Sequence, residues 1–131
     1  MTKKELSQLY CLKREIKEQQ KRIKELEAAA TSCSSKIDGL PSGTGISDKI
    51  GKYAVQIADL KSLLDLNLKK CFYELNRLNH YIQSVEDSQM RMILTLRYIN
   101  GLTWRQIAKS LGVIGDGSTE RKKLNRFLRR K

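Results

Sequence analysis

The sequence has little of what a β-rich or membrane-spanning protein needs. Its 131 residues include one proline, eight glycines and two phenylalanines. A β-rich domain of this size needs more turn residues and more β-branched and aromatic side chains, and we find no convincing strand. The chain also lacks a run of about 18 apolar residues, so no segment is expected to span a membrane. These absences predict an all-α fold.

Cysteine and histidine are scarce as well, which argues against metal and redox chemistry. Cys11, Cys33 and Cys71 are too far apart for a metal-binding knuckle or a redox pair. An odd number of cysteines without a signal peptide favours a reducing cytosol, so we expect a cytoplasmic protein. His80 is the only histidine and has no second ligand near it. Because paired carboxylates or a nucleophile with a base cannot be assembled either, we expect no enzyme activity, no metal and no cofactor.

Residues 1–30 are expected to form an amphipathic helix with a narrow apolar seam. The residues between the seam positions are mostly Lys, Arg, Glu and Gln, which is typical of a coiled coil or helical hairpin. Gln19 interrupts the seam. Residues 31–47 are crowded with serine and glycine, which disfavour a helix, and are expected to form a loop. The seam consists of Leu9, Leu12, Ile16, Ile23 and Leu26.

Residues 48–86 are expected to form a second, coiled-coil-like helix. Apolar residues recur along it at steps of three and four, so they share one face of a helix roughly 58 Å long. Such a rod cannot cover its own seam. It must pack against the first helix folded back, against a second subunit, or both. The expected seam consists of Ile50, Tyr53, Ile57, Leu60, Leu64, Leu68, Cys71, Leu75, Leu78, Ile82 and Val85.

Positive charge is concentrated in the last third of the chain. The formal net charge of the whole sequence is +12. Residues 89–131 contain 11 Lys and Arg against two acidic residues, a balance of +9, whereas residues 1–88 contain 15 against 12, a balance of +3. This distribution favours a polyanion-binding end carried on a nearly neutral rod.

Residues 87–131 have the pattern of a three-helix helix-turn-helix domain. A first helix capped by Asp87 or Ser88 ends at Asn100 and Gly101. A second helix begins with a capping box between Thr103 and Gln106. A third, strongly basic helix follows from Ser118 and has an embedded apolar seam. The expected core of the helix-turn-helix comprises Trp104, Ile107, Ala108, Leu111, Gly112, Leu124, Phe127 and Leu128.

The basic third helix is the candidate DNA-reading element. Its face opposite the apolar seam is expected to contact base edges and the groove through Ser118, Thr119, Lys122, Lys123, Arg126 and Arg130. Phosphate contacts position a protein on DNA without specifying sequence. The residues expected to make them are Arg97, Arg105, Lys109, Arg129 and Lys131.

Two stretches carry a resemblance to known families. The residues from Arg97 to Ala108, followed by Leu111 and Gly112, resemble region 4 of bacterial sigma factors and lie in the C-terminal segment 87–131, about a third of the chain. That region has the pattern Leu-Arg-Tyr, two residues, Gly-Leu-Thr, two residues, Ile-Ala, two residues, Leu-Gly. Residues 39–51, between two long helices, resemble small phage and prophage proteins related to the RinA/ArpU-like late transcription activators. The resemblance implies a DNA-binding regulator encoded by a phage or prophage of a Gram-positive bacterium.

The chain departs from the sigma pattern in two places. Six residues, 113–118, stand where the pattern has four, so we expect a longer and looser turn before the third helix. Glu120 occupies a position that is usually a buried Val or Ile. An uncompensated buried carboxylate would cost several kcal/mol, so we expect Glu120 at the rim near Arg121 and Lys123.

The sequence therefore predicts sequence-specific binding of double-stranded DNA by a transcription regulator that forms a homodimer through its long helices. Contact with the RNA polymerase of the bacterial host is left open. Two other classes remain as alternatives. A protein similar to the small terminases of DNA packaging would form a ring rather than a dimer, and a helical interaction adaptor would bind no DNA.

Overall fold

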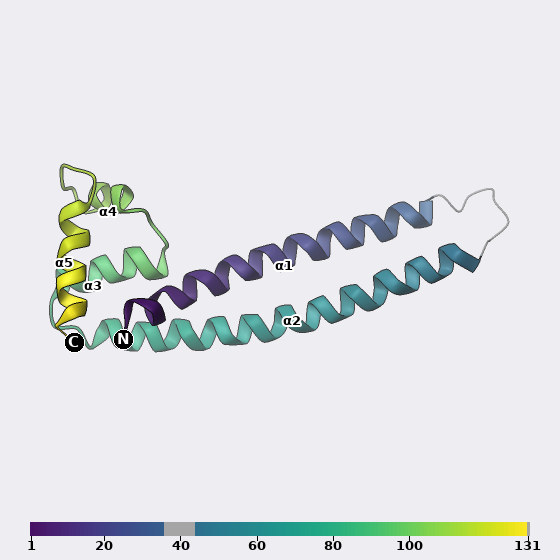
Figure 1. The fold of residues 1–131 in the computed structure, drawn as a ribbon, viewed down its shortest axis with the longest axis horizontal. Helices are drawn as coiled ribbons and strands as arrows, with labels where there is room; N and C mark the ends of the chain where they lie inside the picture. Colours follow the sequence, from purple (N-terminus) through teal and green to yellow (C-terminus); the bar gives the residue numbers. More distant parts are fainter. Residues whose placement is uncertain (36–43, 131) are drawn as a thin grey trace. The chain divides into compact units, whose positions relative to one another are not determined.

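The structure, a computed structural model, describes the backbone of residues 1–35 and 44–130 and the side chains of residues 1–32 and 49–130. These residues form helices and no strand, which confirms the all-α class (Figure 1). None of the described helices is long and apolar enough to cross a membrane. The elements in chain order are α1 (Lys3–Ser35), α2 (Thr44–Gln83), α3 (Ser88–Leu94), the π-helical turn η1 (Thr95–Ile99), α4 (Trp104–Ser110) and α5 (Ser118–Arg129).

The two long helices extend further into the serine- and glycine-rich segment than the sequence predicts. α1 continues to Ser35 and α2 begins at Thr44, so helix occupies both ends of the expected loop. The serine-rich start of this segment contains neither glycine nor proline, which are the residues that break helices most strongly. Its centre, residues 36–43, lies outside the described residues.

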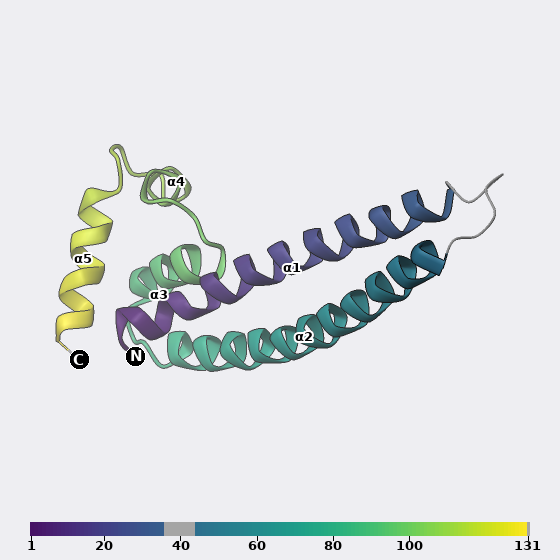
Figure 2. The ribbon, with the colours of Figure 1, turned by 45° about the vertical axis from the view of Figure 1, so that its right-hand side comes forward.

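The chain divides into two compact units, one formed by residues 14–70 and the other by residues 1–13 together with 71–131. In the first unit, α1 and α2 lie antiparallel and side by side (Figures 1 and 2). Ile16 and Ile23 of α1 are buried between them, as the seam predicts. Two helices alone leave both flanks of a seam open to solvent. The facing residues of α2 are therefore only half-buried, namely Tyr53, Ile57, Leu60, Leu64 and Leu68.

A polar pair interrupts this apolar seam. Asn67 is buried, and its side-chain nitrogen donates to the amide oxygen of Gln19 at 3.1 Å. The hydrogen bond satisfies both groups and accounts for the gap that Gln19 makes in the seam of α1. A single polar pair in a helical seam fixes the register of the two helices, since any shift leaves a buried amide without its partner.

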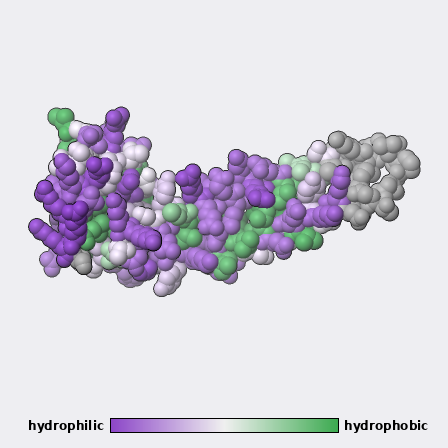
Figure 3. Space-filling model, viewed as in Figure 1, coloured by the Kyte–Doolittle hydropathy of each residue, from purple (hydrophilic) through white to green (hydrophobic). Residues whose placement is uncertain are grey.

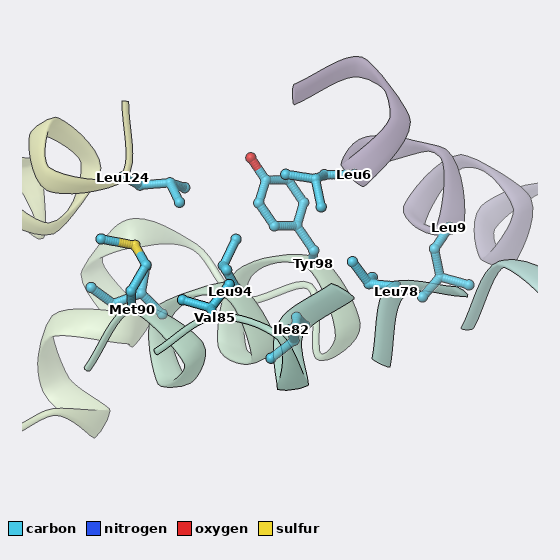
Figure 4. Packing of buried hydrophobic residues seen from close by; sticks show 10 residues of the cluster. Leu6, Leu9, Leu78, Ile82, Val85, Met90, Leu94, Tyr98 and Leu124 are labelled. Atoms are coloured by element: carbon cyan, nitrogen blue, oxygen red, sulfur yellow. The ribbon is translucent and has the colours of Figure 1, made fainter. Parts of the chain in front are cut away.

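The second unit has a hydrophobic core that is larger than the expected 87–131 domain. Its buried residues come from the start of α1, the end of α2 and the residues just after it, α3, η1 and α5, and partly buried residues of α4 pack against them (Figure 4). In Figure 4, Tyr98 of η1 lies between Leu6 of α1 and Leu124 of α5. The helix-turn-helix therefore shares one core with both long helices, through Leu6, Leu9, Leu78, Ile82, Val85, Met90, Ile93, Leu94, Tyr98 and Leu124.

Local caps define α3, the first helix of the C-terminal segment, much as the sequence predicts. Asp87 is the N-cap of α3, and its carboxylate accepts from the backbone N–H groups of Gln89 and Met90. The last turn is wider than an α-helix: the N–H of Asn100 donates to the carbonyl of Thr95 at 3.0 Å. Gly101, with φ of 69°, then reverses the chain toward α4.

The start of α1 is tied to α2 by a charged cluster, which makes the stability of this unit dependent on pH. The carboxylate of Glu5 accepts from the backbone N–H and the hydroxyl of Thr2, at 2.7 and 3.0 Å, and from Arg77 at 2.9 Å. These hydrogen bonds lower the pKa of Glu5 from 4.5 to about 2, and the bond from the Thr2 N–H has the largest effect. A carboxyl with a lower pKa in the folded than in the unfolded state stabilises the fold above its unfolded pKa.

We expect the stability that Glu5 contributes to be complete above pH 4.5 and to be lost as the pH falls toward 2. The substitution Glu5→Gln should therefore lower the unfolding midpoint at pH 7 and leave it nearly unchanged near pH 2. Urea unfolding followed by circular dichroism at both pH values measures this. Glu15→Gln, at an exposed position of α1 with no ion pair among the described residues, is the control. An equal effect of Glu5→Gln at both pH values would contradict the prediction.

Candidate nucleic-acid interface

The predicted capping box opens α4. The N–H of Gln106 donates to the Thr103 hydroxyl at 3.3 Å, and the N–H of Thr103 donates to the Gln106 side chain at 2.9 Å. Ile107 and Ala108 are fully buried. Trp104 and Leu111 on the same face are half-buried, so the predicted inward face of this helix is confirmed.

α4 ends in a Schellman motif. The N–H of Val113 donates to the carbonyl of Ala108 at 2.9 Å, and the N–H of Gly112 donates to that of Lys109 at 3.2 Å. Gly112 has φ of 70°, the left-handed conformation that this motif requires. The expected stop signal at Gly112 is confirmed, but its predicted place in the helix-turn-helix core is wrong: Gly112 is exposed, because the chain leaves the α4 surface at this turn.

The connection from α4 to α5 is longer than the sigma pattern but not looser, which corrects that expectation. Gly117 is buried with φ of 80°, and a Cβ at this position would overlap the carbonyl oxygen of Trp104. Asp116 accepts from the N–H of Ser118 at 3.0 Å, and this bond lowers the pKa of the Asp116 carboxyl, with a smaller contribution from Arg105. The start of α5 is thus held directly against the start of α4.

α5 packs on α3 and α4 through its predicted apolar seam, but Glu120 is buried rather than at the rim. Leu124 is 1% exposed and Glu120 2% exposed. The prediction for Glu120 was wrong because a residue four positions before Leu124 lies on the same inward face of a helix. Glu120 is also in the first turn of α5, where unbonded backbone N–H groups and the helix dipole favour a negative charge. Arg121 and Lys123 are exposed.

The outward face of α5 is a basic surface. Its predicted groove-contacting residues Thr119, Lys122, Lys123, Arg126 and Arg130 are all exposed, and Ser118 is half-buried at the start of the helix. Among the described residues, no carboxylate forms an ion pair with the basic members of this set. Figure 3 shows hydrophilic residues covering α5. This surface can accept a dense array of negative charges.

Three of the residues expected at phosphates are free to reach a ligand, and one is engaged within the fold. Arg105 and Lys109 on α4 and Arg129 on α5 are exposed. The Arg97 guanidinium instead lies 4.9 Å from the centre of the Trp104 ring and donates to the carbonyl of Leu102 at 2.8 Å. Arg97 therefore supports the start of α4, a role that its sequence position did not reveal. Lys131 lies outside the described residues.

A second basic residue, missed by the sequence analysis, also supports the domain. Lys13 of α1 donates to the carbonyl of Ile99 at 2.8 Å, at the end of η1 where the widened turn leaves carbonyl groups unpaired. No periodicity marks Lys13 as special, because it belongs to the polar face of an amphipathic helix. Only the close approach of α1 to η1 gives it this contact.

The described residues contain no cluster of three His, Cys, Asp or Glu side chains arranged to hold a metal ion. Cys11 and Cys71 are free thiols, and the side chain of Cys33 lies outside the described residues. Comparison with protein-family models, curated proteins and solved structures gives no match to this chain. Functional inference therefore depends on the geometry and charge of the surface around α5.

The tight approach at Gly117 predicts a strong difference between two glycines of the same turn. Gly117→Ala should lower the free energy of unfolding by more than about 2 kcal/mol, because it combines left-handed strain with overlap on the Trp104 carbonyl. Gly112→Ala meets no atom within 4 Å and should cost only about 1 to 2 kcal/mol for the left-handed conformation. Chemical unfolding of both variants measures this. Equal losses would show that the α4–α5 turn is not closed at Gly117.

Proposed function

We propose that this protein is a sequence-specific, double-stranded DNA-binding transcription regulator whose helix α5 enters the major groove. The observation that carries the proposal is the exposed basic face of α5, which has no ion pairs within the described residues. The start of this helix packs closely on the backbone of α4 at Gly117. An unneutralised basic helix face in a helix-turn-helix is the arrangement used to read base edges.

Two groups of residues act differently in the proposed complex. Lys122 and Arg126, one turn apart on the outward face of α5, contact base edges; an arginine or lysine donates well to the O6 and N7 atoms of guanine. Arg105, Lys109 and Arg129 contact phosphates on either side of the groove and set the register of the protein on the duplex. The capping box of α4 occupies the N–H groups of Thr103 and Gln106, and we assign the phosphate contacts to side chains.

We further propose that the protein acts as a dimer through the helix pair of residues 14–70. The half-buried seam residues of α2 retain apolar surface that a single pair of helices does not cover. Figure 3 shows apolar residues as a green band along the visible face of this pair. A second copy would cover this surface, and two linked reading helices would add the specificity of a second half-site.

The resemblance to the phage and prophage activators supports a role for this dimer at promoters in the cytoplasm of a bacterial host. Host RNA polymerase is a further candidate partner in that setting. The competing assignments, a ring-forming packaging protein and an adaptor that binds no DNA, differ from the proposal in mass or in affinity for DNA.

The charge mechanism predicts a steep salt dependence of DNA binding. If six to eight basic side chains neutralise phosphates, the logarithm of the association constant should fall against the logarithm of the salt concentration with a slope of roughly −5 to −7. Fluorescence anisotropy with a labelled duplex between low and physiological salt measures the slope. A slope shallower than about −2 rejects the proposal.

The triple substitution Lys122→Ala, Lys123→Ala and Arg126→Ala should weaken binding by about 100-fold or more and reduce the salt slope. Its control is Lys17→Ala, Lys24→Ala and Lys70→Ala, which removes the same charge from exposed positions of α1 and α2. If both triple variants lose affinity equally, only the overall charge matters, and α5 does not read DNA.

The mass in solution separates the dimer from the alternatives. Sedimentation equilibrium at tens of micromolar should give twice the chain mass of 15.1 kDa. A monomer at this concentration contradicts the proposed pairing, and a larger closed assembly favours the ring of a packaging protein.

A further inference from the structure

The turn between α4 and α5 presents an apolar side chain entirely to solvent. Ile114 is 102% exposed and its neighbour Val113 is 40% exposed. In Figure 3, green atoms project from the molecule at this turn. A turn of this kind normally contains polar residues, so an isoleucine at its tip calls for a physical account.

The exposure of Ile114 follows from a constrained backbone rather than from a slack loop. The Schellman motif at Gly112 fixes one end of the turn, and the buried Gly117 with the Asp116 to Ser118 hydrogen bond fixes the other. Between them, Gly115 has φ of 139°, a conformation that an L side chain rarely adopts. The two fixed ends limit the backbone freedom of the short segment between them, which presents Ile114 to solvent at the tip of the turn.

The surroundings of Ile114 favour a nucleic acid over a protein as the occupant. A protein-binding surface is normally a contiguous apolar patch of a few hundred Å². Here the apolar surface is limited to two side chains between glycines. The one acidic group of the turn, Asp116, accepts from the N–H of Ser118 and is also attracted to Arg105. The exposed charged residues at the end of α4 and the start of α5, Lys109 and Arg121, are basic. A polyanion with a small apolar feature fits this surface.

Such a feature exists in the major groove. Thymine presents its C5-methyl group there, and apolar side chains distinguish thymine by contact with that methyl. The turn leads directly into the N-terminus of α5, the part of a recognition helix that meets base edges. We propose that Ile114 is a specificity-determining residue that contacts the C5-methyl of a thymine beside the N-terminus of α5. This inference rests on the proposed DNA-binding function.

The test uses a duplex that the wild-type protein selects from a random library, made once with thymine and once with deoxyuridine in its place. Deoxyuridine pairs like thymine and lacks only the methyl group. Wild type should bind the deoxyuridine duplex about fivefold more weakly. Ile114→Ser should bind the thymine duplex about tenfold more weakly than wild type and should be insensitive to the replacement. Ile114→Val, which keeps the methyl surface, should retain most of the discrimination.

The control variant is Met92→Ser, which removes a half-exposed apolar side chain from α3, outside the proposed dimer surface. It should bind both duplexes as wild type does. On each duplex, the affinity of Ile114→Ser is compared with that of wild type. If the substitution weakens binding by the same factor on the thymine and the deoxyuridine duplex, or weakens neither, the assignment of a methyl contact is overturned. Failure of the wild type to bind with a steep salt slope would instead reject the proposed function itself.

Discussion

The close approach of Gly117 to the backbone of Trp104 is the contact on which the basic surface depends. It joins the first residue of α4 to the N-cap of α5, so it sets the direction in which the outward face of α5 points. The same tryptophan lies under the guanidinium of Arg97. A change at this point would leave the charges of α5 in place but alter their geometry, and base readout depends on geometry more than phosphate binding does.

The helix-turn-helix has no independent core. Leu6 and Leu9 of α1 and Leu78 and Ile82 of α2 are buried with its own apolar residues in one cluster. The three short helices α3, α4 and α5 bury too little apolar surface to be stable alone. The ends of the long helices supply the remaining apolar surface of the core. The stability of the proposed DNA-binding unit is therefore linked to the pairing of α1 with α2 at its base.

Much of the helical architecture could be predicted from local pattern. The steps of three and four in the long helices, the Thr103 capping box and the stop at Gly112 depend on residues close together in sequence, and each is confirmed. The prediction for Glu120 was wrong because the general cost of burying a carboxylate was given more weight than its helical position, which places it on the same inward face as Leu124. The role of Arg97 was also missed, since its ring partner and carbonyl acceptor are recognisable only once the chain has turned at Gly101.

Apart from the ends of α1 and α2 that face each other along the chain, the sequence by itself determined which segments are helical, which faces of them are apolar, and that the excess positive charge lies at the C-terminal end. These properties follow from the spacing and chemistry of neighbouring residues. Only the tertiary structure decided that α1 and α2 complete the core around Tyr98, that Glu120 lies inward, and that Ile114 stands fully exposed. Each of these depends on contacts, or on their absence, between residues distant in the chain, and local periodicity has no information about them.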